Sequence, residues 1–406
     1  MKRLAIIGGG MSGSIAGIVA ANNNLKIDIY ERQDSILKKI LLTGNGRCNI
    51  SNESIDTGDY ITSAPDLLSI YLDNFDRQAE ARFFNQLGIY TRSKNGGLYP
   101  CTNQAVTVRN TLVNLLEQKK VNIITEAYID NIKVAGTKYV INDKAYDYCI
   151  LACGGMAGVY KESELNGYQI LKNLAIRYGF CYPGLVQVKC KSDIYKGLKG
   201  IRFDGQVTLT SDGETVAVDK GEVQITENGL SGIVIFQHSR YIGALLREKH
   251  SLTFEIDLLY DFADTELIAN LEAAKGSFGD LILIDYLSSY VNSRILLSIS
   301  ELEGVINKSL KDISVEDFLR VVSILRCWRH NIKELNPYKN AQVSVGGLEL
   351  TKLTDSFMLK SHHNLFVTGE MVDATGKCGG YNLHFATLSG FLSGQYIKKD
   401  SSNASN

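Results

Sequence analysis

The sequence predicts an α/β fold in which the two ends of the chain form one domain and the middle forms an insertion. A short apolar run, a glycine turn and a small-residue helix open the chain, and the same order returns near its end. Short alternating runs between them are typical of antiparallel strands, and a long stretch with Leu and Ile at helical intervals follows. Glycine is abundant (37) and proline rare (4) in 406 residues, as expected of glycine turns between strands and helices.

The first domain part begins with a strand–turn–helix–strand unit. Residues 4–7 are a short apolar run typical of a buried parallel strand, residues 8–13 form the turn, and small apolar residues at 14–22 predict a close-packed helix. A second strand covers residues 25–30 and stops at Glu31. Further along, we expect helical structure over 66–87 and 106–118, and strands over 121–124, 128–134, 139–141 and 148–152.

The middle of the chain predicts two kinds of structure. Alternating runs at 206–210, 215–218, 223–226 and 251–256 indicate a small antiparallel barrel or sheet, and residues 264–329 are helix-like. Towards the end of the chain we expect strands at 341–345 and 365–368, a helix over 381–396 and a frayed polar tail over 398–406. The predicted division is 1–187, 188–260, 261–336 and 337–406, with the first and last segments forming one domain.

Composition and charge exclude several classes of protein. Hydrophobic residues make up 45%, and 43 basic residues nearly balance 44 acidic ones, so neither a disordered chain nor a large basic field for nucleic acid is expected. The eight cysteines contain no C-x-x-C pair, which favours free thiols in a reducing cytosol over a metal site. No apolar run is long enough for a signal peptide or a membrane span, and we expect a cytoplasmic protein.

The turn after the first strand carries a nucleotide-binding motif. Gly8-x-Gly10-x-x-Gly13 lies between a strand and a helix, where Gly8 permits a tight turn, Gly10 a close approach of phosphate, and Gly13 close helix packing. Glu31 ends the second strand, where an acid can bind a ribose hydroxyl. A dinucleotide site is therefore favoured over a purely structural glycine turn. The motif alone leaves FAD and NAD open.

Three longer segments resemble one family. The run KKILLTGNGRCNISN at 38–52, the run GEVQITENGLSG at 221–232 and the run TGEMVDATGKCGGYNLHFA at 368–386 are similar to the signatures of BaiN-like flavoproteins, also called the aminoacetone-oxidase family of FAD-binding enzymes. Together they span nearly the whole chain. The middle run departs from the family at Glu227, where His is usual, and at Ile233, where Pro is usual, so the substrate does not follow from the resemblance.

The resemblance implies a Rossmann-type, two-part FAD-binding domain with an inserted antiparallel β-barrel-like domain and a helical segment. It places FAD on residues from both ends of the chain. Those expected to bind the cofactor are Gly8, Gly10, Met11, Ser12, Gly13, Glu31, Arg32, Lys39, Thr43, Gly44, Asn45, Gly46, Arg47, Cys48, Asn49, Ala127, Ala152, Gly154, Gly155, Gly369, Glu370, Asp373, Gly379, Gly380, Tyr381, Asn382 and Leu383.

The expected activity is an FAD-dependent oxidoreductase that transfers hydride through flavin N5. NAD(P)H-linked reduction of a conjugated C=C bond in a small organic molecule is favoured. NAD(P)H is expected to bind only transiently, because no second strand–glycine–helix unit for a nicotinamide dinucleotide is found. Oxidation of aminoacetone or another amine by O₂, modification of RNA, and a non-catalytic FAD-binding scaffold are the alternatives. No catalytic residue stands out. Lys377, His384 and Arg47 are candidates. The competing interpretations are a solvated lysine for Lys377, a core or surface histidine for His384 and a structural ion pair for Arg47.

Overall fold

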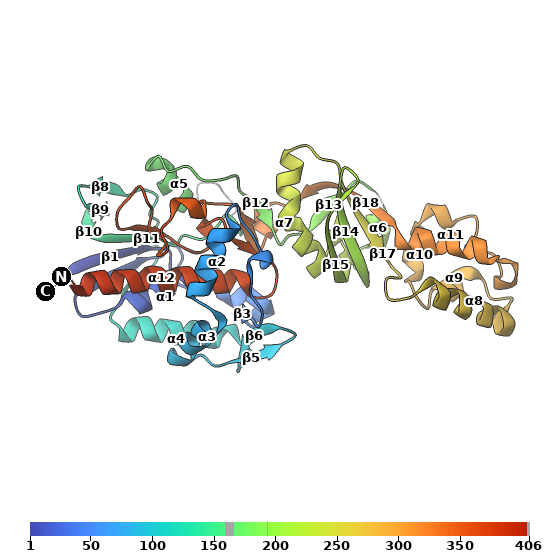
Figure 1. Ribbon diagram of the computed structural model, residues 1–406, viewed down its shortest axis with the longest axis horizontal. Helices are drawn as coiled ribbons and strands as arrows, with labels where there is room; N and C mark the ends of the chain where they lie inside the picture. The colour runs from blue at the N-terminus through green and yellow to red at the C-terminus, as the bar shows by residue number, and fades with distance from the viewer. Residues whose placement is uncertain (159–165, 193, 404–406) are drawn as a thin grey trace. The chain divides into compact units, whose positions relative to one another are not determined.

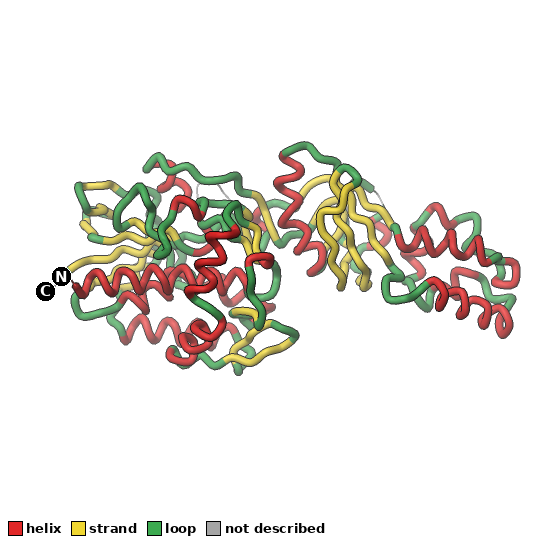
Figure 2. The backbone as a smooth tube through the Cα atoms, in the orientation of Figure 1, coloured by secondary structure: helices red, strands yellow, loops and turns green. Residues whose placement is uncertain are grey.

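A computed structural model describes residues 1–158, 166–192 and 194–403. The chain forms two compact units, one of residues 1–182 with 342–406, the other of residues 183–341. Each contains both helices and strands (Figure 2). The division predicted at residue 260 is not seen, because the apolar side chains of the strands and of the helices that follow them share one core in the second unit.

The first unit is built on a five-stranded parallel sheet with the order β20-β11-β1-β2-β7. The last part of the chain therefore supplies an edge strand, next to β11. Most of the side chains of β1, β2 and β11 are buried, as expected of a parallel sheet covered on both faces. The sheet strands are β1 (Lys2–Ile7), β2 (Leu25–Tyr30), β7 (Asn122–Ile124), β11 (Tyr148–Leu151) and β20 (Leu365–Val367).

Three long helices pack together beside this sheet. These are α1 (Met11–Ala20), α4 (Ala105–Gln118) and α12 (Tyr381–Asn403), with α4 and α12 both in contact with α1 (Figure 1). Helices α1 and α12 approach closely, since a Cβ at Gly390 would come within 2.3 Å of the Ser12 carbonyl oxygen. A second small sheet, made of β8 (Lys133–Ala135), β9 (Lys138–Ile141) and β10 (Lys144–Tyr146), contacts β1 and β11.

Three sequence predictions in this unit need correction. The helix expected over 66–87 is two helices, because Asp76 caps α3 by accepting a hydrogen bond from the Ala79 N–H at 2.6 Å. The strand expected over 128–134 is reduced to β8, since Ile129 and Ile132 are buried at a spacing of three rather than in alternation.

The remaining elements are α2 (Pro65–Asn74), α3 (Arg77–Gln86), α5 (Asn166–Asn173), β3 (Ser51–Asn52), β4 (Tyr60–Ile61), β5 (Thr91–Lys94), β6 (Gly97–Pro100), β12 (Tyr182–Gly184), β19 (Val343–Val345) and β21 (Thr375–Gly376).

The third correction concerns the end of the chain. Helix α12 continues through most of the tail that was expected to fray, and residues 404–406 lie outside the described part of the chain. Ile397 is buried, and the Asn22 side-chain amide donates a hydrogen bond to Ser401 at 2.9 Å. Asp400 also forms an ion pair with Lys2 at 2.9 Å. These contacts hold the last turns against the first residues of the chain.

The second unit contains the predicted antiparallel barrel. Six strands close in the order β13-β16-β15-β14-β17-β18, and α7 (Ile233–Arg247) packs against them. The helical stretch that was predicted over 264–329 ends at Arg326, because Trp328 begins the last barrel strand. The elements are β13 (Val188–Cys190), α6 (Tyr195–Leu198), β14 (Arg202–Ser211), β15 (Glu214–Ile225), β16 (Gly229–Ser231), β17 (Leu252–Asp257), α8 (Asp264–Phe278), α9 (Leu283–Leu287), α10 (Ser293–Ser298), α11 (Val315–Arg326) and β18 (Trp328–Leu335).

A buried histidine in this barrel predicts acid sensitivity. Nδ1 of His330 lies 2.6 Å from the Tyr195 hydroxyl, and burial lowers the pKa of His330 to about 3. In the unfolded chain the His330 imidazole binds a proton below about pH 6.5, whereas in the folded chain it binds one only near pH 3. The free energy of unfolding should therefore decrease as the pH is lowered from 6.5 to 3, by up to about 1.4 kcal/mol per pH unit. Urea unfolding at several pH values measures this slope, and His330→Asn should flatten it. An unchanged slope in the variant would contradict the assignment.

Candidate functional site

The turn between β1 and α1 is held by close backbone packing. The Gly8 N–H donates to the Tyr30 carbonyl oxygen at 2.8 Å, which ties the turn to the end of β2. Gly8 has a φ of 109°, and a Cβ there would come within 2.2 Å of the Ala152 carbonyl oxygen. A Cβ at Gly13 would come within 2.1 Å of the Gly8 carbonyl oxygen. Only glycine fits at both positions, and this allows the turn to be tight.

The first turn of α1 leaves backbone N–H groups free to bind an anion. No described side chain caps the helix, and its first turn contains no acidic residue. A Cβ added to Gly10, the residue before the helix, would meet no described atom within 4 Å, apart from its chain neighbours. Open space therefore faces an uncapped helix N-terminus, whose N–H groups and partial positive charge favour phosphate. This arrangement fits the pyrophosphate of FAD.

A second open position follows β11. Gly154 has a φ of 76°, and a Cβ there would also meet no described atom within 4 Å. The Cys153 thiol just before it donates to the Ile7 carbonyl oxygen at 3.3 Å, and burial raises the pKa of this thiol to about 12. Cys153 therefore stays protonated at neutral pH. It joins the ends of β1 and β11, next to Gly8.

Glu31 lies against the glycine turn. One of its carboxylate oxygens accepts from the Gly9 N–H at 2.9 Å and the other from the Gln33 N–H at 2.9 Å. The Ala127 N–H donates to the Glu31 carbonyl oxygen at 2.9 Å, so the structure brings these two predicted residues together, with Arg32 directly after Glu31. Each carboxylate oxygen can accept a further hydrogen bond. Contact of Glu31 with a ribose stays a prediction.

The loop expected after β2 folds as a 3₁₀ segment, η1 (Lys38–Gly46). Gly44 and Asn45 have left-handed backbone conformations, with φ of 56° and 53°, and both are exposed. The Thr43 hydroxyl donates to the Ile40 carbonyl oxygen at 2.7 Å, and the Cys48 N–H donates to the Thr43 carbonyl oxygen at 3.1 Å. The segment therefore presents its glycine-rich backbone on the surface of the unit.

The three residues after this segment differ in environment. Arg47 is exposed and has no carboxylate partner among the described residues, so the competing interpretation of a structural ion pair finds no support there. Cys48 is buried, and burial raises the pKa of its thiol to about 11, which favours a packing role over a reactive thiolate. The Asn49 Oδ1 atom is buried and accepts no hydrogen bond from any described atom. Such an orphaned acceptor fits a hydroxyl of a bound cofactor.

The first and last signature segments lie side by side. The Lys39 ammonium pairs with the Glu370 carboxylate at 2.8 Å, and the Asn52 amide donates to the Gly379 carbonyl oxygen at 3.0 Å. A Cβ at Gly380 would come within 2.4 Å of the Ser51 carbonyl oxygen. Strand β21 of the last segment also pairs with β4, which follows the first. Residues more than 300 positions apart therefore form one site.

Glu370 is anchored by a residue that the sequence did not single out. The Ser344 N–H donates to one Glu370 oxygen at 2.9 Å, and the Ser344 hydroxyl to the same oxygen at 3.2 Å. A Cβ at Gly155 would come within 2.0 Å of the Ser344 hydroxyl and 2.4 Å of Glu370. Sequence reasoning could have found Ser344 from its position at the end of a strand, just before Gly346-Gly347. Glu370 thus holds three segments together, and its predicted contact with a ribityl chain stays untested.

Asp373 and Gly369 also serve as anchors. The Ser63 N–H and hydroxyl both donate to one Asp373 oxygen, at 2.9 and 2.6 Å. The Gly369 N–H donates to the Ser389 hydroxyl at 2.9 Å, and a Cβ at Gly369 would come within 2.7 Å of the Ser12 hydroxyl. The close approach of Gly369 to Ser12 brings the last segment against the first turn of α1.

The side chains at the start of α12 turn back onto the protein. The Asn382 amide both accepts from the Gly376 N–H and donates to the Gly376 carbonyl oxygen, each at 2.9 Å. Tyr381 is buried, and the Tyr60 hydroxyl donates to its carbonyl oxygen at 3.0 Å. Leu383 is half-buried. These residues would therefore fix the helix start, and its backbone would be the part available to a cofactor.

Two of the three catalytic candidates are already paired. Lys377 forms an ion pair with Asp59 at 2.5 Å and lies over the Tyr381 ring, 5.1 Å from its centre, although its side chain is still 36% exposed. His384 is buried, and its Nδ1 atom lies 2.9 Å from a carboxylate oxygen of the buried Glu80. The Ser51 hydroxyl donates to Glu80 at 2.6 Å. Of the three candidates, Arg47 is the one with no carboxylate partner among the residues that the structure describes.

Comparisons with known proteins agree with this geometry. The family described as "HI0933-like protein Rossmann domain" matches residues 2–396. The chain is 32% identical over 406 residues to the 3-dehydro-bile acid delta(4,6)-reductase of Clostridium scindens, covering 97% of this chain and 98% of that protein. It is 23% identical over 398 residues to the ribosomal RNA dihydrouridine synthase of Escherichia coli, covering 96% of each.

Among solved structures, a similar chain is the 3-ketosteroid-delta4-(5alpha)-dehydrogenase of Rhodococcus jostii in complex with 4-androstene-3,17-dione. The two chains are 12% identical with a TM-score of 0.48, over 98% of this chain and 97% of the other. Within the described part of the chain, no helix is long and apolar enough to cross a membrane.

The fold and the family match define a flavoprotein oxidoreductase with a Rossmann-type FAD-binding fold. Within that class, the chain belongs to the HI0933-like family. The resemblance stated from the sequence signatures is therefore confirmed, and so are the predicted fold class and enzyme class.

Proposed function

We propose that the protein binds FAD and reduces a C=C bond conjugated to a carbonyl group in a steroid-like molecule, with electrons from NAD(P)H. The observation that carries this proposal is the uncapped N-terminus of α1 facing open space at Gly10. Gly369, from the last part of the chain, lies against Ser12 in the first turn of this helix. The substrate class is supported by the Clostridium scindens relative, a 3-dehydro-bile acid delta(4,6)-reductase that matches nearly the full length of this chain.

In this proposal, the backbone does most of the cofactor binding. The N–H groups of the first turn of α1 would hold the pyrophosphate, and the Asn49 Oδ1 atom would accept a hydroxyl. The start of α12, at Gly379 and Gly380, would stabilise negative charge on the flavin ring by about 0.3–2 kcal/mol. When bound, FAD supplies hydride transfer through N5 of its ring system.

Arg47 would bind the carboxylate of an acidic substrate. Its guanidinium group is exposed beside the turn at Gly44, and an unpaired guanidinium binds carboxylates in a bidentate manner. Lys377 and His384 are poorer choices for direct substrate contact, because each is bound to a carboxylate of the protein, Asp59 and Glu80 respectively. Both would instead support the start of α12.

The proposal predicts a reaction that depends on a conjugated substrate. The purified protein should show the absorption of oxidised flavin, and without oxygen it should oxidise NADH or NADPH only when a conjugated steroid enone is present. The product should gain two hydrogen atoms, one as hydride and one as a proton. The matched saturated ketone is the control and should not be reduced. Peroxide formed from an amine without any nicotinamide would refute the proposal in favour of an amine oxidase.

A second candidate function is the reduction of uridine in ribosomal RNA. The Escherichia coli relative of 23% identity is a ribosomal RNA dihydrouridine synthase, and dihydrouridine is uridine with its ring C=C bond reduced. A hollow of about 730 Å³ on the second unit carries Lys189, Lys191 and Lys333, although Lys189 is paired with Glu334 at 2.8 Å. Formation of dihydrouridine in added ribosomal RNA, with no reduction of the enone, would favour this candidate.

A further inference from the structure

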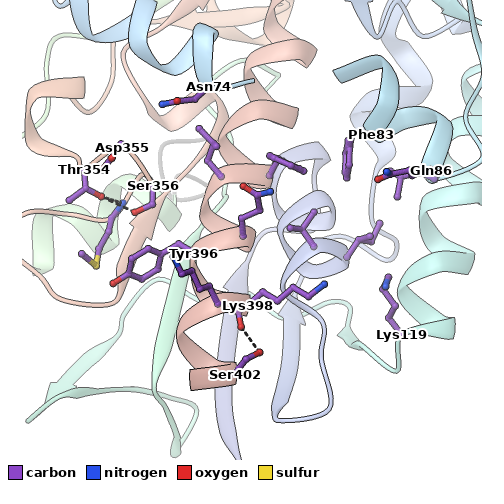
Figure 3. Close-up of a pocket in the computed structure, with 18 of the residues that line it drawn as sticks. Asn74, Phe83, Gln86, Lys119, Thr354, Asp355, Ser356, Tyr396, Lys398 and Ser402 are labelled. Carbon is purple, nitrogen blue, oxygen red and sulfur yellow. Dashed lines mark hydrogen bonds between the residues drawn. The ribbon is translucent and has the colours of Figure 1, made fainter. Parts of the chain in front are cut away.

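A groove on the first unit lies away from the candidate flavin site. It has a volume of about 1240 Å³ and runs over the C-terminal half of α12, with the segment 354–356 on one side and α3 on the other (Figure 3). The start of α12 belongs to the candidate flavin site, and Lys398 in the groove lies about 26 Å farther along the same helix. The two sites are therefore distinct.

The floor of the groove is apolar. It includes Phe83 from α3, Leu87 just after that helix, and Phe391 and Leu392 from α12. The rings of Phe83 and Phe391 meet edge to face, with their centres 5.0 Å apart. Leu87, Phe391 and Leu392 are only half-buried, so the floor leaves apolar surface in contact with water. An apolar body that covers this surface would gain about 25 cal/mol for each Å² removed from water.

The wall of the groove carries positive charge. Lys119 follows α4, and Lys398 and Lys399 lie near the end of α12. All three are exposed, and none forms an ion pair with any residue in the described ranges. Lys119 lies across the groove from Asp355, with Lys398 between them (Figure 3), and Asp355 is the one acidic side chain among the lining residues. Three ammonium groups beside an apolar floor therefore face one carboxylate.

We infer that this groove binds an amphipathic organic anion, with its apolar body on the floor and its carboxylate against the lysines. A neutral apolar ligand would leave the three ammonium groups without a partner. A compact anion would leave the apolar floor uncovered. Only a ligand with both parts matches the two features, and the volume is sufficient for a long-chain or polycyclic carboxylate.

The test compares two probes of equal chain length and opposite charge. Calorimetric titration of the purified protein with dodecanoate, below its critical micelle concentration, should show saturable binding, and dodecyltrimethylammonium should bind at least about tenfold more weakly. The variant K119Q/K398Q/K399Q should lose at least about tenfold in affinity for dodecanoate. Affinity should also fall as salt rises from about 0.05 M to about 0.5 M, because the contact is exposed to solvent.

A matched control separates a local effect from a change in net charge. The variant K26Q/K133Q/K172Q removes three other exposed lysines of the same unit, away from the groove, and should bind dodecanoate as the parent protein does. Equal affinity for both probes, equal loss in both lysine variants, or no binding of dodecanoate would overturn the inference. A dimer in light scattering that Leu87→Glu dissociates would also overturn it, because a second copy of the chain would then cover the groove.

Discussion

Gly10→Ala is expected to abolish retention of FAD while leaving the fold intact. The new Cβ would meet no described atom of the protein, and the backbone of Gly10 (φ −75°, ψ −168°) suits alanine. The methyl group would therefore occupy only the space assigned to the pyrophosphate. We expect FAD affinity to fall at least about a hundredfold, which corresponds to about 2.7 kcal/mol. Flavin absorption after gel filtration and titration of the apoprotein with FAD measure the effect.

Two further glycine variants give this experiment its controls. A Cβ at Gly276, in α8 of the second unit, also meets no described atom within 4 Å, so Gly276→Ala should keep both FAD and stability. Gly13→Ala should lose both, because its Cβ would come within 2.1 Å of the Gly8 carbonyl oxygen. If Gly10→Ala retains FAD as tightly as Gly276→Ala does, the pyrophosphate does not lie at α1 and the proposed site is wrong.

Glu80→Ala is expected to be strongly destabilising. The Glu80 side chain is fully buried and accepts hydrogen bonds from the Ser51 hydroxyl at 2.6 Å and the Arg77 guanidinium at 3.2 Å, and it lies 2.9 Å from His384. Removing the buried Glu80 carboxylate leaves the buried Ser51 hydroxyl and His384 ring without this partner. We expect the free energy of unfolding of the apoprotein to fall by about 3–5 kcal/mol, measured by urea unfolding.

The control for this prediction removes the histidine as well. The double variant E80L/H384F replaces both polar partners by apolar side chains, and it should recover part of the loss that Glu80→Ala causes. Glu117→Gln, at an exposed position on α4, should change the free energy of unfolding by no more than about 0.5 kcal/mol. A loss in Glu80→Ala as small as that in Glu117→Gln would show that the cluster contributes nothing to stability.

The sequence predicted those parts of the site that depend on local chain geometry. The turn at Gly8, Gly10 and Gly13 follows from steric demands within one strand–turn–helix unit, and the structure places it as expected. Three barrel strands, β14, β15 and β17, were likewise predictable, because alternation of apolar residues is a property of each strand, whereas β13, β16 and β18 were not predicted. The break between α2 and α3 had a local signal at Asp76, which sequence reasoning overlooked.

Contacts between distant residues could not be read from the sequence. Glu80 is the one acidic residue within α3 and nothing in its local sequence indicates a partner, so only the fold places it against His384, which is 304 positions away. Ser344 and Ser63 were missed for the same reason, since a serine carries no signal until its acceptor is known. The apparent frayed tail was misjudged because Lys2, Asn22 and Tyr148, which contact its residues, lie far away in the chain.

The edge position of β20 and the close fit of α12 on α1 have a consequence for biosynthesis. A ribosome releases the segment that completes the parallel sheet only after residues 183–341 have emerged as one continuous stretch. The barrel unit can therefore acquire its structure while synthesis continues. The nucleotide-binding unit must wait, with β11 lacking its edge neighbour β20, until the segment that carries β20 and α12 has left the exit tunnel.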